Sequence, residues 1–261
     1  MTFLVVLVNV FIYELILWIK KETDLFPTVS FSIAIALLLL SSGYSAFQLW
    51  SYRGLIKRLP KVRAALIQTN IGNFEKSKAF RGYEDAVLFA KETNERLSVE
   101  ATKQGPLDLI VLPETAVPGY FTEDRPVNQA EMFHLASRVG TPIAFGGYHK
   151  TQAPSPKVYN SLFLISPHFQ ILGTYNKMNL LLFGEYLPLS STFPILNEWF
   201  PQVGNFATEE KIEALSLSKE LRFAPLICLE GLYPNFVRKF IKEGAQFIVT
   251  VTNDSWFGRT S

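Results

Sequence analysis

Cysteine and histidine are scarce in this 261-residue chain, and so is net charge. The single cysteine, Cys228, cannot form an internal disulfide, so cysteine usage leaves the redox compartment open. The three histidines show no metal-ligand spacing and no glycine-rich phosphate loop is present, so the sequence implies no metal, no nucleotide and no other cofactor. A formal charge of +2 is too small to indicate a nucleic-acid partner.

Charge is also missing from a long stretch near the N-terminus, because no charged residue occurs from Leu25 to Tyr52. A transmembrane helix needs about 20 mostly apolar residues, so we predict one over about residues 29–50. Residues 2–19 are a weaker candidate, apolar except for Asn9 and Glu14; an intramembrane glutamate usually faces other helices. A signal peptide is the alternative for this segment, but it lacks a basic start and a small-residue cleavage site.

A basic linker, residues 53–63, follows this expected two-helix transmembrane segment, residues 1–52. We interpret it as a solvated juxtamembrane segment that touches lipid headgroups. The basic residues of this linker are Arg53, Lys57, Arg58, Lys61 and Arg63. They outnumber the two basic residues of the loop between the spans, Lys20 and Lys21. Counted by the positive-inside rule, these charges place the following domain in the cytoplasm.

Residues 64–261 alternate short β-rich runs with polar helical stretches, and this alternation predicts a layered α/β domain. The expected strands are 62–71, 108–112, 142–148, 161–165, 170–175, 222–229 and 246–251. The expected helices are 78–103, 131–139 and 234–243. Residues 190–218 are rich in proline and aromatic residues and are expected to form a long loop, a common place for a substrate-facing lid.

Three of the expected strands end in charged or reactive residues rather than in typical core residues. Glu114, Lys177 and Cys228 each lie at the end of an apolar run. Each alone is a weak signal, because a charge after a strand is usually solvated and a lone cysteine is usually a small buried hydrophobe. Together they supply a base, a cation and a nucleophile, which is a complete set for acyl transfer.

The segments around these three residues resemble the nitrilase, or carbon–nitrogen hydrolase, superfamily. The matching segments are VLPETAVPGY around Glu114, YNKMNLLLFGEYLPL around Lys177, PLICLEGLYP around Cys228, and VTNDSWFG at 251–258. They look most like the apolipoprotein N-acyltransferases of the bacterial envelope, since FGEYLPL and NDSWFG favour these over soluble amidases. The resemblance runs from about Ala64 to the last residue and implies an α-β-β-α sandwich attached to a helical membrane part. It also implies a fragment whose sandwich is incomplete at the C-terminus, with further membrane helices before Met1.

A Glu-Lys-Cys triad is what this resemblance implies for Glu114, Lys177 and Cys228. Glu114 would take the thiol proton, and Cys228 would attack an ester carbonyl to form a thioacyl enzyme. Lys177 would stabilise the oxyanion, and a backbone N–H near Leu229 could add a second donor. Leu229 itself departs from the family pattern, in which an aromatic residue follows the cysteine.

Five further residues are weaker site candidates. Glu185 and Glu230 match glutamates that support the active site in this family; a carboxylate near the lysine would hold its ammonium charged and oriented. The alternative for both is a structural hydrogen bond or an exposed loop charge. Tyr120, Phe121 and Trp256 are possible substrate-binding residues, although Trp256 could equally close the core.

The function implied by the resemblance is phospholipid-to-lipoprotein N-acyl transfer. A membrane phospholipid would donate the acyl chain, and the N-terminal amine of a diacylglyceryl-cysteine apolipoprotein would accept it. The family places the catalytic domain in the periplasm, on the bacterial inner membrane, against the charge count. Two alternatives stay open: a membrane-tethered carbon–nitrogen hydrolase acting on a small amide, and an inactive membrane-associated fragment.

Overall fold

The structure, a computed structural model, describes residues 2–72, 83–117, 119–121, 126–152, 155–190, 192–200 and 203–253. The chain divides into two compact units, residues 1–61 and residues 62–261. Each unit is described by itself.

The first unit is a pair of helices, α1 (Thr2–Ile19) and α2 (Thr28–Ile56). Of the described helices, α2 alone is long and apolar enough to cross a membrane. Its 29 residues rise about 44 Å, more than the roughly 30 Å of a bilayer core. The prediction of two full spans is therefore corrected to one. The apolar stretch of α1, Phe3–Ile19, is shorter than that of α2.

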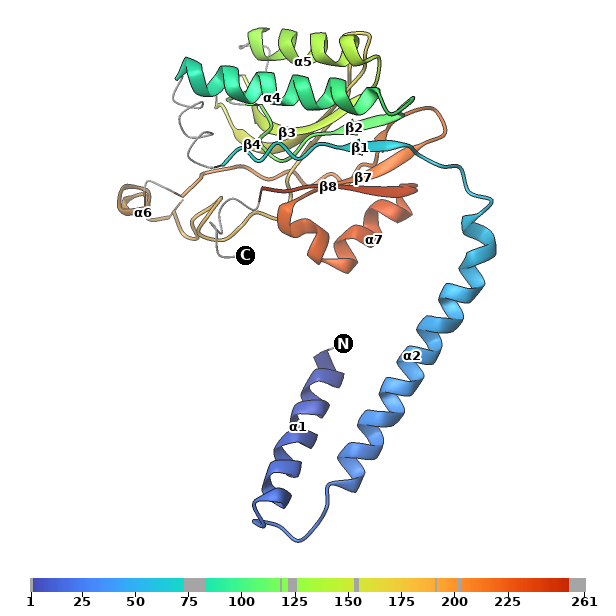
Figure 1. The fold of residues 1–261 in the computed structure, drawn as a ribbon. Coiled ribbons are helices and arrows are strands. Elements are labelled where there is room, and N and C mark those ends of the chain that lie inside the picture. The colour runs from blue at the N-terminus through green and yellow to red at the C-terminus, as the bar shows by residue number, and fades with distance from the viewer. Residues whose placement is uncertain are drawn as a thin grey trace. The chain divides into compact units, whose positions relative to one another are not determined.

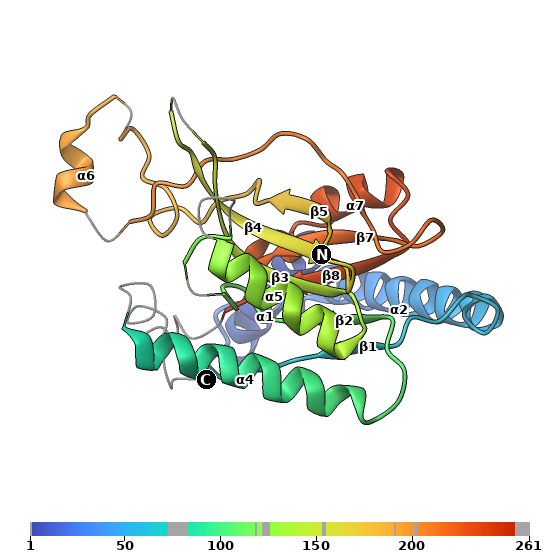
Figure 2. The same cartoon turned by 90° about the horizontal axis from the view of Figure 1, so that it is seen from above.

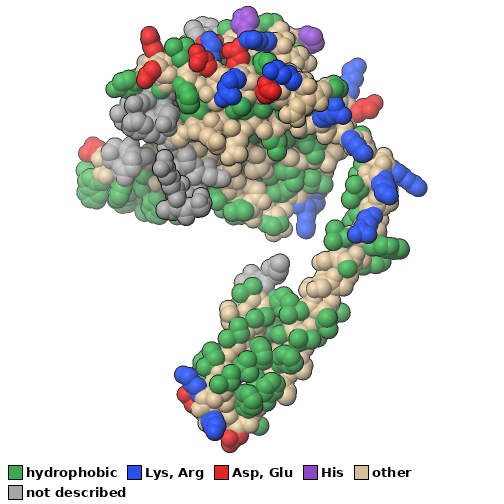
Figure 3. Space-filling view, viewed as in Figure 1, with side chains coloured by type: hydrophobic (Ala, Val, Ile, Leu, Met, Phe, Trp, Pro, Cys, Tyr) green, Lys and Arg blue, Asp and Glu red, His purple; other side chains and the backbone are tan. Residues whose placement is uncertain are grey.

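Glu14 is the charged residue within α1, and its carboxylate accepts a hydrogen bond from the Ser30 hydroxyl of α2. This contact confirms the expectation that the glutamate faces the neighbouring helix. The visible surface of the helix pair is otherwise apolar, with charged side chains at its ends (Figure 3). Exposing such an apolar surface to water would cost free energy, and burying it in a bilayer would remove that cost.

The second unit is built around two β-sheets. The five-stranded sheet runs in chain order through β1 (Ala64–Leu66), β2 (Leu109–Val111), β3 (Ile143–Lys150), β4 (Val158–Ile165) and β5 (Ile171–Asn176). The three-stranded sheet contains β6 (Leu215–Ser216), β7 (Arg222–Ile227) and β8 (Phe247–Val251). The pairs β1·β2, β2·β3 and β7·β8 are parallel, and the other pairs are antiparallel.

Helices cover the outer faces of both sheets. Helices α4 (Glu84–Thr102) and α5 (Pro126–Val139) lie over the five-stranded sheet, and α7 (Pro234–Lys242) lies under the other (Figures 1 and 2). The layers follow the α-β-β-α order that the resemblance implied. Strand β2 is buried on both faces: Leu109 and Val111 pack in the core that includes β7 and β8, and Ile110 packs with α5. An apolar run such as LIV is what a strand covered on both faces requires.

The element boundaries differ from the sequence-based prediction in a few places. The expected loop 190–218 contains a short helix, α6 (Ile195–Trp199), and the two-residue strand β6. The first expected strand is only three residues long. The strand expected over 222–229 ends at Ile227 and is followed directly by a 3-10 helix, η1 (Cys228–Leu232). The predicted N-terminal part of α4, residues 78–82, lies outside the described residues.

Candidate active site

Glu114 follows β2 and is 7% exposed. The segment that carries it crosses closely over β3: the Gly146 N–H donates to the Pro113 carbonyl at 3.2 Å, and the Ala116 N–H donates to the Gly146 carbonyl at 3.0 Å. A Cβ on Gly146 would lie 2.6 Å from the Glu114 Cα, so only glycine fits. The Glu114 N–H reaches the Thr252 carbonyl beyond β8 at 3.4 Å. Glu114 is thereby held where the carboxyl ends of β2 and β8 meet.

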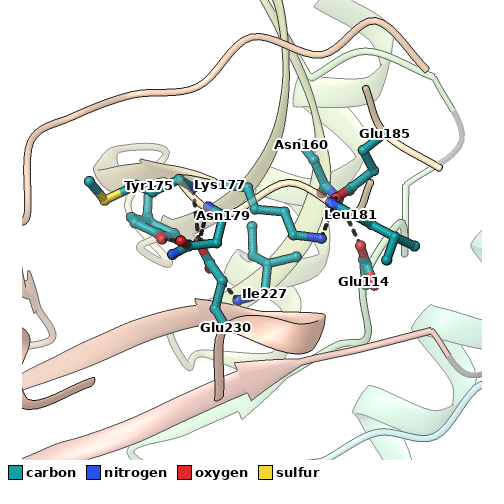
Figure 4. Close-up of polar contacts among 10 residues, drawn as sticks. Glu114, Asn160, Tyr175, Lys177, Asn179, Leu181, Glu185, Ile227 and Glu230 are labelled. Carbon is teal, nitrogen blue, oxygen red and sulfur yellow. Dashed lines mark hydrogen bonds and ion pairs between the residues drawn. The ribbon is translucent and has the colours of Figure 1, made fainter. Parts of the chain in front are cut away.

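Lys177 follows β5 and is 1% exposed. A buried ammonium is stable only when it is paired, and the Lys177 Nζ lies 2.7 Å from Glu185 Oε2 (Figure 4). The same oxygen accepts the Leu181 N–H at 2.8 Å, which fixes the carboxylate within its own turn. The structure thus places Glu185 beside the lysine, as the resemblance implied.

Asn160, on β4, connects the two carboxylates. Its Nδ2 donates to Glu114 Oε1 and to Glu185 Oε1, each at 2.7 Å. Its backbone carbonyl accepts the Lys177 N–H at 2.8 Å. The sequence analysis missed this residue, although a buried asparagine in the strand VYNSLFLI is a signal that could have found it.

Cys228 is the first residue of η1, directly after β7. It is half-buried and adopts a left-handed φ of +54°, a strained backbone conformation for a residue that carries a Cβ. Burial raises the pKa of the thiol, and the negative charge of Glu114 raises it further. Lys177, the Thr252 side chain and the Leu229 N–H act in the opposite direction. The three candidate residues are therefore close enough to influence one another, and the resting thiol is protonated.

Glu230 is fully buried and binds a different part of the site (Figure 4). Its Oε1 accepts from the Tyr175 hydroxyl at 2.7 Å and from the backbone N–H groups of Met178 and Asn179 at 2.9 and 3.0 Å. Its Oε2 accepts the Ile227 N–H at 2.9 Å. Glu230 therefore ties the segment after Lys177 to the end of β7. Burial raises the pKa of Tyr175, and the negative charge of Glu230 raises it further.

Tyr148, the cross-strand neighbour of Asn160, is a second residue that the sequence analysis missed. Burial raises its pKa, and the charges of Glu114 and Glu185 raise it further, so the phenol stays neutral beside the two carboxylates. Its ring stacks on Phe206 at 5.3 Å between centroids. The sequence of β3 gives no sign that Tyr148 lies beside Glu114 and Glu185.

Of the three possible substrate-binding residues, two lie in the described part of the chain. Tyr120 is half-buried, forms a β-bridge with Tyr148, and carries the Lys150 ammonium 5.6 Å from its ring centroid. Phe121 is 1% exposed and packs in the core on Phe145 and Phe163. Trp256 lies outside the described residues.

The arrangement brings together a carboxylate, an ammonium and a thiol at three neighbouring strand ends. Nucleophilic acyl chemistry requires three such groups. A carboxylate can accept the thiol proton, an ammonium can stabilise a developing oxyanion, and a thiol can supply the sulfur nucleophile. Within the described ranges, no three His, Cys, Asp or Glu residues gather as a metal site would require.

Comparison with known proteins points to the same chemistry. Residues 63–261 match the family described as carbon–nitrogen hydrolase. The apolipoprotein N-acyltransferase of Geobacter metallireducens is 33% identical over 264 residues, covering 100% of this chain and 48% of the relative. That of Bdellovibrio bacteriovorus is 33% identical over 254 residues, covering 93% of this chain and 46% of the relative. The chain spans about half the length of the curated relatives it matches.

Solved structures share the fold at low sequence identity. A carbon–nitrogen hydrolase from Helicobacter pylori superposes with a TM-score of 0.51 at 17% identity, covering 73% of this chain and 59% of that one. An amidase of the nitrilase superfamily from Nesterenkonia gives 0.50 at 17% identity, covering 74% of this chain and 67% of that one. The family match includes the segments of Glu114, Lys177 and Cys228, and this chain belongs to the carbon–nitrogen hydrolase family as an apolipoprotein N-acyltransferase-like member.

Proposed function

We propose that this chain carries the catalytic site of an N-acyltransferase, with Glu114 as the base, Lys177 as the oxyanion-stabilising cation and Cys228 as the nucleophile. Glu114 takes the thiol proton while the sulfur attacks an ester carbonyl. Lys177 and the Leu229 N–H stabilise the oxyanion, which collapses to a thioester as the alkoxide leaves with the proton from Glu114. An amine then attacks the thioester, gives its proton to Glu114, and releases Cys228.

The observation that carries this proposal is the buried line of contacts from Glu114 through Asn160 and Glu185 to Lys177. Each contact in the line measures 2.7 Å. Cys228 lies beside it with a raised pKa, so it cannot act as a free thiolate and needs a neighbouring base. The negative charge of Glu114 contributes to the raised pKa of Cys228, which supports the choice of Glu114 as the base.

The substrates in this proposal are a membrane phospholipid as donor and the N-terminal amine of a diacylglyceryl-cysteine apolipoprotein as acceptor. Two observations support them. The similarity to apolipoprotein N-acyltransferases extends over the whole chain, including α1 and α2, whereas the solved structures cover about three quarters of it. The apolar helix α2 also suits a chain that works at a bilayer, where such substrates are found. We further propose that the catalytic unit lies on the periplasmic side of the inner membrane.

The test is the identity of the group that Cys228 accepts. The chain in phospholipid vesicles is incubated, quenched in acid and measured by intact mass. A long-chain acyl adduct that maps to Cys228, and is absent from Cys228→Ala, is the expected result. Turnover of small amides without a phospholipid-derived adduct would overturn the acyltransferase and favour an amidase. No adduct and no turnover with either substrate would favour a binding module.

A further inference from the structure

Short contacts join two carboxylates and one ammonium in this site, where Glu114 and Lys177 are buried and the Glu185 side chain is 12% exposed. Glu185 is paired with Lys177, and Glu114 lies on the other side of the Asn160 amide. Two carboxylates in direct contact share a proton, because both cannot remain ionised at close range. A shared proton would disable a base that has to accept one from Cys228.

The Asn160 amide lies between the two carboxylates. Its Nδ2 has two hydrogens, and each bonds one carboxylate at 2.7 Å, a length typical of charge-assisted bonds. An amide does not titrate near neutral pH, so it bonds both carboxylates without supplying a proton to either. The side chain is 3% exposed, and strand pairing on both sides of β4 fixes its backbone.

We propose that Asn160 is a positioning residue that separates Glu114 from Glu185 by donating a hydrogen bond to the carboxylate of each. Glu185 stays paired with Lys177, and Glu114 alone is available for the proton of Cys228. This inference rests on the proposed function, because it assigns Asn160 a part in the same reaction. The titratable groups that face the two carboxylates are Lys177, Tyr148 and Cys228.

The test uses the titration of Cys228, which requires no substrate. The rate of alkylation by iodoacetamide is measured against pH by intact mass in the full chain, for the wild type and Asn160→Leu. Without the two N–H donors, Glu114 loses a hydrogen bond that favours its charged form, and the negative charge that raises the thiol pKa is reduced. The expected result is a downward shift of the apparent thiol pKa by roughly 1 unit. The matched control is Ser161→Ala on the same strand, whose side chain bonds Asn176 instead; it should leave the titration unchanged.

Acyl transfer is measured on the same variants. Asn160→Leu should lower kcat by about 100-fold, the usual contribution of a positioned base, with little change in KM. If Asn160→Leu does not fold, Asn160→Ser keeps one donor and should give a smaller shift in the same direction. An unchanged thiol titration in a folded variant overturns the positioning role, whatever its transfer rate. If the wild type transfers no acyl group at all, the proposed function fails, but the titration still decides the role of Asn160.

Discussion

The pKa of the Cys228 thiol is shifted by two opposite charges, and the effect of each charge can be tested separately. Burial and Glu114 raise the pKa of the thiol, while Lys177 lowers it. Glu114→Gln removes the negative charge, so the thiol should ionise at lower pH and alkylate faster near neutral pH. Lys177→Met removes the positive charge and should shift the same profile to higher pH.

The measurement is the alkylation rate of Cys228 as a function of pH. Shifts of opposite sign in the two variants are the expected outcome. Shifts of the same sign, or none, would mean that Glu114 and Lys177 do not act on the sulfur in the folded chain.

Glu230 is predicted to matter for stability. It is fully buried and accepts four hydrogen bonds, three of them from backbone N–H groups. Glu230→Leu leaves these donors without a partner, and each buried unsatisfied group costs about 1–3 kcal/mol. We expect the free energy of unfolding to fall by at least about 2 kcal/mol, measured by denaturant titration in detergent.

The matched control for this prediction is Glu220→Leu, at an exposed turn position. It should change the free energy of unfolding by less than about 0.5 kcal/mol. Equal effects of the two substitutions would contradict the role assigned to Glu230.

At the scale of elements, the site depends on a close crossing of the segment after β2 over β3. Gly146→Ala would place a Cβ 2.6 Å from the Glu114 Cα and 2.9 Å from the Thr115 nitrogen. Backbone must move to relieve this overlap, so we expect a loss of about 1–3 kcal/mol of stability together with a displaced Glu114. Thermal unfolding and the rate of thioester formation report the two effects.

Gly147→Ala, one residue further along β3, is the control for this crossing. Its added Cβ would meet the Phe163 ring at 3.4 Å and the Phe121 Cβ at 4.0 Å, which are ordinary contacts. It should keep most of the wild-type rate. A Gly146→Ala variant as active and as stable as Gly147→Ala would show that the crossing is not needed.

Most of the strands could be predicted because they carry continuous apolar runs, and strands such as β2 and β7 are buried on both faces. Glu114, Lys177 and Cys228 could be found because each lies at the end of an expected strand. The short elements α6 and β6 give no periodic signal. Asn160 was missed because its importance lies in contacts with Glu114 and Glu185, which are 46 and 25 residues away along the chain.

At the scale of the whole molecule, we propose that the chain associates with a membrane through α2. Leu39 and Leu40 lie in the middle of its apolar stretch, and their side chains are 67% and 69% exposed. An arginine at the centre of a transmembrane helix costs roughly 2.5–3.5 kcal/mol. The double substitution of both leucines by arginine should therefore remove the chain from vesicles in a flotation assay.

Leu88 and Phe89 on α4 provide the control, since they are also adjacent, exposed and apolar. Their replacement by arginine should leave flotation unchanged. If the α2 variant floats as well as the wild type, α2 is not the membrane anchor.

The central claim is that Glu114, Lys177 and Cys228 together move an acyl group from a phospholipid to an amine. Its most direct test is the fate of the acyl group: the chain is loaded in vesicles of acyl-labelled phospholipid and then given a diacylglyceryl-cysteine peptide. We predict that the label leaves Cys228 and appears in amide linkage on the N-terminus of the peptide, and that Glu114→Gln abolishes the transfer. Label that appears only as free fatty acid, with the peptide unmodified, would contradict the account.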